Sequence, residues 1–112
     1  MTIQIVIGSR EFSAVLYDNA AAALKDLLPM TLDMSEFNGN EKYNYLSDKL
    51  PTDQSSPKKI CAGDIMLYGD NCLVLFYEDL STSFSYTPIG RLNDPEGLAK
   101  AVGRGSVTVT WH

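Results

Sequence analysis

The chain has 112 residues, of which 45% are hydrophobic and 21% charged, and its formal net charge is −5 at pH 7. This length and composition predict one globular domain over residues 1–112 and exclude a disordered chain. The acidic balance, with Lys58-Lys59 as the one local basic pair, argues against binding to nucleic acid or to an anionic membrane surface.

The beginning of the chain suggests the compartment. The segment MTIQIVIGSR alternates like a strand and lacks the basic start of an export signal, and no apolar run is long enough to cross a membrane. We therefore expect a cytoplasmic protein, unless a longer precursor is exported and its signal is removed.

Two alternating segments open the chain. Thr2–Ile7 and Arg10–Tyr17 alternate between apolar and polar residues on either side of the turn Gly8-Ser9. This pattern predicts a first β-hairpin with one buried face.

A short helix is expected next. Asp18 or Asn19 can cap it, Ala20–Leu28 continues it, and Pro29 ends it. Most of its stability should come from docking its leucine stripe across one barrel mouth, and the stripe consists of Leu24, Leu27 and Leu28.

The segment after this helix mixes strand and loop signals. Met30–Glu36 alternates and predicts a third strand. Phe37–Tyr45 carries aromatic residues among polar ones, and its Asn38-Gly39 pair indicates an irregular strand or a bulge. Leu50–Lys59 contains two prolines and no apolar period, which is typical of a surface loop.

The most apolar part of the chain is a predicted central hairpin. Its strands are Ile65–Tyr68 and Cys72–Tyr77, joined by Gly69-Asp70-Asn71. Both faces of the run LVLFY in the second strand are apolar, so each face must be covered by other parts of the fold.

The same hairpin constrains the two cysteines. Cys72 should face about Tyr68, whereas Cys61 should lie opposite about Asp79, too far away for a disulfide within the hairpin. We interpret both as buried or half-buried thiols. With only the terminal His112 besides, they cannot complete a tetrahedral zinc site, and no metal or cofactor is expected.

The last part of the chain predicts a strand, a helix and a strand. Tyr86–Leu92 is a short strand that Pro88 confines to an edge or a bulge. Asn93–Glu96 resembles a helix start, and Gly103 resembles a helix end. The expected apolar side of this helix consists of Leu98, Ala99, Ala101 and Val102. The alternating segment Val107–Trp111 closes the chain.

Together these elements predict a mainly β fold with seven or eight short strands and two short helices. The absence of a βαβ rhythm argues against a parallel sheet, and so many antiparallel strands in a small chain favour a closed barrel with the helices at its ends.

Several segments resemble the small bacterial cyclophilin-like domains. They are Met34–Tyr43, Ala62–Tyr68, Leu75–Tyr77, Tyr86–Leu92 and Val107–Trp111, which together extend over nearly the whole chain in order. The resemblance implies an eight-stranded antiparallel cyclophilin-like β-barrel with two capping helices. It does not extend to the prolyl isomerases themselves, because the chain has no internal His, no Phe-His-Arg run and no Gly-Gly-Asp.

The region around the central hairpin supplies most candidate ligand-binding residues. The full candidate set is Glu41, Tyr43, Met66, Phe76, Tyr77, Phe84, Tyr86 and Arg91.

Each candidate also has a structural interpretation. Phe76 can be an ordinary core residue. Arg91 can form an ion pair with Glu78 or Asp94. Phe84, a single aromatic residue in a polar segment, can be a plug over the barrel mouth or a ligand contact.

A second cluster lies in the segment after the third strand. Tyr43 and Tyr45 share one strand face, and Asn38, Asn40 and Glu41 lie near them in the sequence. Aromatic rings among amides suit peptide or sugar contacts, and they equally suit a solvated strand.

Three hypotheses on function follow. The first is a non-enzymatic barrel that binds a small molecule or an extended peptide in a cleft beside the central hairpin. The second is a divergent peptidyl-prolyl isomerase in which Arg91 acts on the proline amide nitrogen. The third is a homodimeric scaffold that pairs through an edge near Tyr86–Leu92, so we expect a monomer or a weak homodimer.

Overall fold

The computed structural model describes residues 1–112 except for the side chains of residues 19 and 20. The strands are β1 (Thr2–Ile7), β2 (Arg10–Leu16), β3 (Met30–Phe37), β4 (Glu41–Tyr45), β5 (Lys59–Ile60), β6 (Asp64–Tyr68), β7 (Cys72–Phe76), β8 (Leu80–Ser81), β9 (Thr87–Leu92) and β10 (Val107–Trp111). The helices are α1 (Asp18–Lys25) and α2 (Leu98–Val102).

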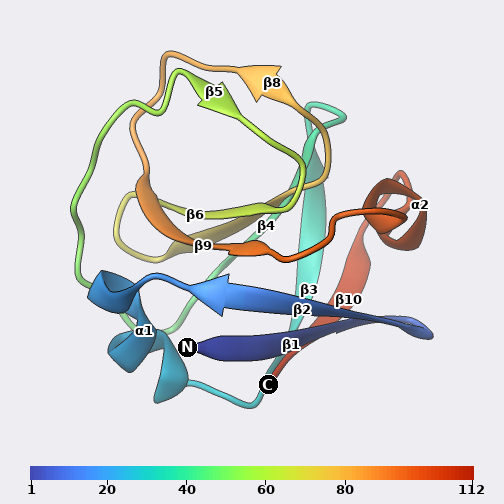
Figure 1. Ribbon diagram of the computed structural model, residues 1–112, viewed down its shortest axis with the longest axis horizontal. Coiled ribbons are helices and arrows are strands. Elements are labelled where there is room, and N and C mark those ends of the chain that lie inside the picture. The colour runs from blue at the N-terminus through green and yellow to red at the C-terminus, as the bar shows by residue number, and fades with distance from the viewer.

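Eight strands form a closed barrel in the order β1-β10-β3-β4-β7-β6-β9-β2, and every neighbouring pair is antiparallel (Figure 1). The other two strands, β5 and β8, form a separate ribbon over the outside of the barrel. The predicted closed eight-stranded barrel is thus confirmed. Closure leaves no strand edge open in the barrel itself.

The barrel is filled by the alternating residues of its strands. Ile3, Ile5 and Ile7 of β1 are buried in the main core, as are Phe12, Ala14 and Leu16 of β2. Trp111 of β10 is fully buried in the same core. These are the inward faces that the alternation of the sequence predicts.

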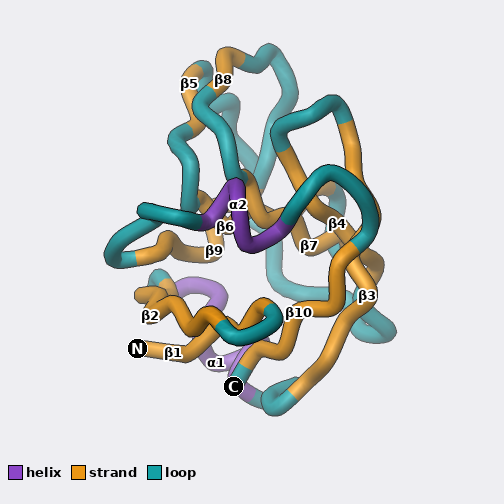
Figure 2. Tube along the Cα trace, turned by 90° about the vertical axis from the view of Figure 1, so that its right-hand side faces the viewer, coloured by secondary structure: helices purple, strands orange, loops and turns teal.

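The two helices lie at opposite ends of this barrel in Figure 1, and in Figure 2 α2 is on the near side with α1 behind the strands. α1 follows the end of β2, and its Leu24 is buried in the main core. α2 lies at the other end, where Leu98 and Val102 are buried in that core. In the described part of the chain, no helix is long and apolar enough to cross a membrane.

The helix boundaries differ from the expected ones. α1 begins already at Asp18 and ends at Lys25, so Asp18 lies in the first turn and makes no side-chain cap. The other proposed cap, Asn19, lies outside the described side chains. Leu27 and Leu28 follow α1 in a tightened turn, yet both still pack against the main core.

The second helix also begins later than expected. Gly97 adopts a left-handed φ of 82° in the turn that the Leu98 N–H closes on the Pro95 carbonyl, and α2 starts only at Leu98. This φ favours glycine, whereas the Arg10 guanidinium that a Cβ would meet there is the end of a flexible side chain. Ala99, expected on the apolar side of the helix, is exposed.

The Asn38-Gly39 pair is a hairpin turn rather than a bulge, which corrects the prediction. Both residues have positive φ, 60° and 70°, and together with Asn40 they form the loop that connects β3 to β4. Two consecutive residues with positive φ in a hairpin loop match the twist of the strands on either side.

Pro88 sits at a bulge, as one of the two predictions stated, because the β6–β9 register shifts between Ile65 and Met66. The other prediction, an edge strand, is wrong. β9 is paired with β6 on one side and with β2 on the other. The open edge that the dimer hypothesis requires at Tyr86–Leu92 is therefore not present in the barrel.

Candidate functional site

The site is built on the outer face of three neighbouring strands. In β4, alternation places Glu41, Tyr43 and Tyr45 on one face. The register of β4 against β7 then sets Glu41 opposite Phe76, and Tyr45 opposite Cys72.

The third strand extends these rows. Tyr68 of β6 lies opposite Cys72, so Tyr45, Cys72 and Tyr68 form one row across three strands. Met66 lies opposite Val74 in the adjacent row. Side chains in such rows lie within contact distance of one another.

A second hydrophobic core covers part of this outer face. It consists of Ile60, Met66, Cys72, Val74, Phe76 and Tyr86, with Tyr43 and Leu80 packed against it. Ile60 and Leu80 belong to the β5–β8 ribbon, which therefore acts as the cover. This confirms that both faces of β7 are covered, since Leu73 and Leu75 point into the main core.

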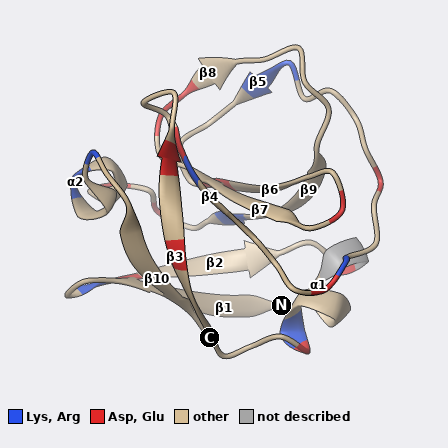
Figure 3. Cartoon of the chain, turned by 180° about the vertical axis from the view of Figure 1, so that it is seen from behind, with Lys and Arg blue, Asp and Glu red and all other residues tan. Residues whose placement is uncertain are grey.

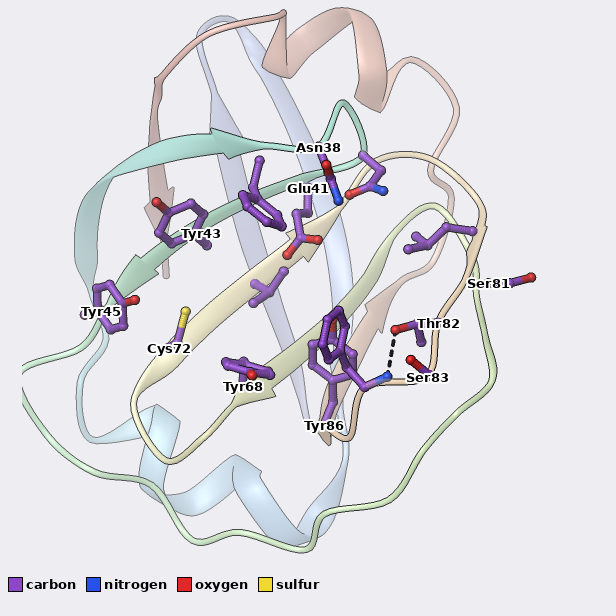
Figure 4. A pocket seen from close by; sticks show the side chains of 15 residues that line it. Asn38, Glu41, Tyr43, Tyr45, Tyr68, Cys72, Ser81, Thr82, Ser83 and Tyr86 are labelled. Atoms are coloured by element: carbon purple, nitrogen blue, oxygen red, sulfur yellow. Dashed lines mark hydrogen bonds between the residues drawn. The ribbon is translucent and has the colours of Figure 1, made fainter.

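The cover is incomplete, and beside it lies an open cavity of about 500 Å³ (Figure 4). Six aromatic residues line it: Phe37, Tyr43, Tyr45, Tyr68, Phe84 and Tyr86. Its other lining residues are Asn38, Asn40, Glu41, Cys72, Val74, Leu80, Ser81, Thr82 and Ser83.

The aromatic residues form two groups of contacting rings. In the first, Tyr43 meets Phe37 at 6.3 Å and Tyr45 at 6.1 Å between ring centroids, both edge-to-face. In the second, Tyr68 meets Phe84 at 6.2 Å and Tyr86 at 5.7 Å. Such pairs hold the rings in place while leaving ring faces open to a ligand.

The cavity also concentrates the exposed aromatic surface of the protein. Tyr45 is 62% exposed, Phe84 57%, Phe37 51% and Tyr68 49%. Single exposed apolar residues are common, but a contiguous group of them around a hollow marks an interaction site.

The loop that carries Phe84 is held by hydrogen bonds. The backbone N–H of Phe84 donates to the hydroxyl of Thr82 at 3.0 Å (Figure 4). Ser55 and Tyr86 exchange two backbone hydrogen bonds of 2.9 Å, which tie the loop to the segment before β5. Phe84 thus lines the wall of a cavity on the outer face of the barrel and does not plug the barrel mouth.

Glu41 supplies the charge of the cavity. Its residue is only 9% exposed, and its carboxyl group points into the space between Tyr43 and Tyr86 (Figure 4). Burial, and next the negative charge of Glu36, raise the pKa of Glu41 to about 7. The carboxyl group is therefore partly protonated at neutral pH.

The thiol in the cavity is not activated. Burial, with the charge of Glu41 as a smaller cause, raises the pKa of Cys72 above its ordinary value. A protonated thiol is a poor nucleophile. The second thiol, Cys61, is exposed rather than buried or half-buried as expected, and both cysteines are free.

Tyr77 belongs to a different cluster at the α2 end of the barrel. Its hydroxyl donates to Glu36 at 2.7 Å, and Lys42 forms an ion pair of 2.9 Å with the same carboxylate. The buried Lys42 ammonium also donates to the carbonyls of Gly103 and Gly105. Every donor here has an acceptor, which is typical of a structural cluster.

The hydrogen bonds of this cluster also shift the pKa values of its acidic groups. Burial raises the pKa of Glu36, but hydrogen bonds from Tyr77, Lys42 and the Gly39 N–H outweigh it, so the net pKa is lowered. Burial and the hydrogen bond to Glu36 raise the pKa of Tyr77 to about 12.

The structure brings together four of the eight candidate residues: Glu41, Tyr43, Phe84 and Tyr86 line the cavity. Met66 and Phe76 lie beneath it in the second core, where Phe76 meets the ring of Tyr86 edge-to-face at 5.7 Å. Tyr77 lies in the Lys42 cluster. The ordinary core interpretation of Phe76 therefore describes its position.

Arg91 lies apart from the cavity. It is exposed on β9, where its backbone is opposite Asp64 and Val15. Among the described residues it forms no ion pair with Glu78 or Asp94.

Several lining residues escaped the sequence analysis. Tyr68 was expected opposite Cys72, so the register could have placed it in the site. Phe37 could have been found only by treating residues 38–40 as a hairpin loop, since that loop sets Phe37 opposite Glu41.

The distribution of basic and of metal-ligating side chains bears on two other kinds of site. Lys and Arg positions are scattered over the described chain and do not form one basic stripe (Figure 3). Within the part of the chain that the structure describes, no three His, Cys, Asp or Glu side chains gather as metal ligands would.

Comparison with known proteins assigns the family. A search of the curated proteins finds no match. A sequence model of the cyclophilin-like family matches residues 5–112. Because this match omits only the first four residues and agrees with the closed barrel, the chain belongs to the cyclophilin-like family.

Proposed function

We propose that this chain is a binding module that takes an extended peptide or a small molecule in the cavity on the outer face of β4, β7 and β6. The observation that carries the proposal is the pair of aromatic groups, Phe37–Tyr43–Tyr45 and Tyr68–Phe84–Tyr86, around an open cavity of about 500 Å³. A volume of this size is in the range of small-molecule sites.

The geometry supports binding better than chemistry. The cavity holds one carboxyl group and one protonated thiol, and no His, Lys or Arg is among its described lining residues. General acid–base or nucleophilic catalysis needs a positioned partner for such a group. A module that binds without reacting requires none.

Titration with an uncharged probe tests the proposal. With ¹⁵N-labelled protein and 1-hexanol, we expect amide shifts confined to β4, β7 and residues 81–86, with a dissociation constant on the order of 1 mM for so small a ligand. Tyr45→Ala should weaken this binding.

The matched control is Tyr17→Ala, because Tyr17 is also exposed, at 38%, but does not line the cavity. Shifts spread over the whole barrel, or equal loss of binding in both variants, would contradict the proposal. The same titration with a capped proline-containing tetrapeptide tests the extended-peptide form of the ligand.

The alternative, a divergent prolyl isomerase, finds less support. It requires a donor beside the proline nitrogen, and the exposed Arg91 does not line the cavity. In a proline-peptide isomerisation assay we expect wild-type rates no faster than buffer. Catalysis that Arg91→Ala removes would reverse this preference and favour the enzyme.

Location and assembly remain predictions from composition and charge. We expect the protein in the cytoplasm, as a monomer or a weak homodimer. Sedimentation at micromolar concentration tests the assembly.

A further inference from the structure

The cavity contains an unmatched set of hydrogen-bonding groups. Glu41 is the one charged side chain among the described lining residues, and in the described chain its carboxyl group has neither a hydrogen-bond nor an ion-pair partner. Asn40 also lines the cavity, and its Oδ1 atom is buried in the wall without a donor. Both unmatched groups are acceptors, so what the cavity lacks is a donor.

An unpaired acceptor at this depth is costly. Glu41 is more than nine-tenths buried as a residue, although its carboxyl oxygens still reach water in the cavity, and partial burial without a partner disfavours the charged form. A ligand with a positively charged N–H donor would provide both the missing hydrogen-bond donor and the missing counter-charge. A neutral or anionic ligand would leave the carboxylate as it is, or repel it.

The aromatic rings around Glu41 suit the same kind of ligand. Ring faces carry negative electrostatic potential, and an ammonium group within about 6 Å of a ring centroid is attracted to it. Tyr43 is next to Glu41 on the same face of β4, Tyr45 follows Tyr43 on that face, and Tyr86 lies across the cavity (Figure 4). The net charge of −5 adds a long-range attraction for cations.

We infer that the cavity selects ligands that carry an organic ammonium group, with the carboxylate of Glu41 as counter-charge and the Tyr43, Tyr45 and Tyr86 rings around the alkyl part. The inference rests on the binding role proposed above and specifies the charge of its ligand. The ammonium group can belong to a free alkylamine or to a lysine side chain in an extended peptide.

The carboxyl group of Glu41 makes this selection pH-dependent. The titratable groups that face it are Glu36 from β3, Cys72 from β7, and Tyr77 and Tyr86 from the segments after β7 and before β9. With a pKa of about 7, Glu41 is mostly ionised above neutral pH and mostly neutral below it. An ammonium ligand should therefore bind more tightly as the pH rises through 7, and its binding should lower the pKa of Glu41.

Three probes of the same length separate charge from size: hexylammonium, 1-hexanol and hexanoate. At about pH 8.5, where an alkylamine is still protonated, we expect hexylammonium to bind at least about tenfold more tightly than 1-hexanol, with hexanoate weakest. At about pH 5.5, where Glu41 is neutral, the preference for hexylammonium should shrink to within about threefold.

Glu41→Gln is the decisive variant, because it keeps the shape and removes the charge. At both pH values its preference for hexylammonium over 1-hexanol should fall to within about threefold, as in the wild type with Glu41 neutral. The pH dependence of the wild type gives the same answer without any substitution, in case the variant does not fold.

The outcomes distinguish the two proposals. If none of the three probes shifts the cavity amides, the binding role itself fails. If all three bind equally, or if Glu41→Gln retains the preference for hexylammonium, the binding role stands and the charge selection is overturned.

A pair of capped pentapeptides distinguishes the source of the ammonium group. One has a central lysine and the other a central norleucine, each between alanines. Tighter binding of the lysine peptide than of hexylammonium identifies a peptide side chain as the source. Equal or weaker binding identifies a free amine.

Discussion

Lys42 carries a positive charge to a place that water does not reach. Its side chain is 0% exposed, and its ammonium group joins Glu36 of β3 to the carbonyls of Gly103 and Gly105 in the loop after α2. Lys42→Met would leave these acceptors unpaired, so we expect a loss of about 3 kcal/mol of unfolding free energy, measured by urea denaturation.

The control for this prediction is Lys49→Met. The Lys49–Asp70 pair spans 3.8 Å with the lysine side chain 81% exposed, and its removal should change stability by less than about 1 kcal/mol. Similar losses in the two variants would show that the buried network contributes no more than a surface pair.

Glu41 should make the protein less stable as the pH rises through neutrality. Its pKa is raised from 4.5 to about 7 in the folded protein, so its contribution is fully present below about pH 4.5 and is lost between there and pH 7. Glu41→Gln should therefore match the wild type near pH 4.

At about pH 8 the same variant should exceed the wild type by about 2 kcal/mol, less than the ~3 kcal/mol of the full shift, since water reaches the carboxyl group through the open cavity. Urea midpoints across this pH range test the prediction. Glu36 acts in the opposite sense, because its pKa is lowered, and it contributes only to a loss of stability in acid. A constant difference between wild type and Glu41→Gln at all pH values would contradict the assignment.

At the scale of the element, Gly90 decides how closely β9 approaches β2. It lies opposite Leu16, and a Cβ there would collide with the carbonyl oxygen of Val15. Gly90→Ala should therefore cost about 2 kcal/mol or more of unfolding free energy in thermal or urea denaturation. Gly105→Ala is the control, since a Cβ at that position meets nothing within 4 Å. Equal unfolding free energies for the two variants would show that the close approach of β2 and β9 does not require glycine at position 90.

The elements also show how far sequence alone leads. The sequence alternates in β1, β2 and β10, and β7 is apolar on both faces. These patterns are sufficient to predict a closed barrel with a covered outer face. Only some of the residues that line the cavity could be predicted, because the register between strands decides which side chains face it. Whether Phe37 faces Glu41 is decided by the type of turn at Asn38-Gly39, which local composition does not specify.

Lys42 marks the other limit of prediction. Its neighbours Glu41 and Tyr43 face the outer surface, so alternation places Lys42 on the inner face, where a lysine is not expected. Only the tertiary structure brings Glu36 and the loop after α2 to its ammonium group. Pairing over such separations leaves no local signal in the sequence.

On the scale of the whole molecule, the two cores suggest two units of different stability. The main core fills the closed barrel, while the second core holds the β5–β8 ribbon, whose two strands have two residues each. Regions with few buried contacts open at lower free energy than the barrel that supports them. Since residues 81–86 form one wall of the cavity, opening of the ribbon would also open the site.

Native-state hydrogen exchange tests this division with two matched substitutions. The Thr82 and Tyr86 amides, which donate to Lys58 and Ser55, report on the ribbon, and the β1–β2 amides report on the barrel. Ile60→Val, in the second core, should lower the opening free energy of both sets by about 1 kcal/mol. Ile5→Val, in the main core, should lower only that of the barrel amides, because the ribbon opens with the barrel intact. If Ile5→Val speeds exchange in the ribbon by the same factor, the ribbon opens only when the barrel unfolds, and ligand entry must then use the cavity as it stands.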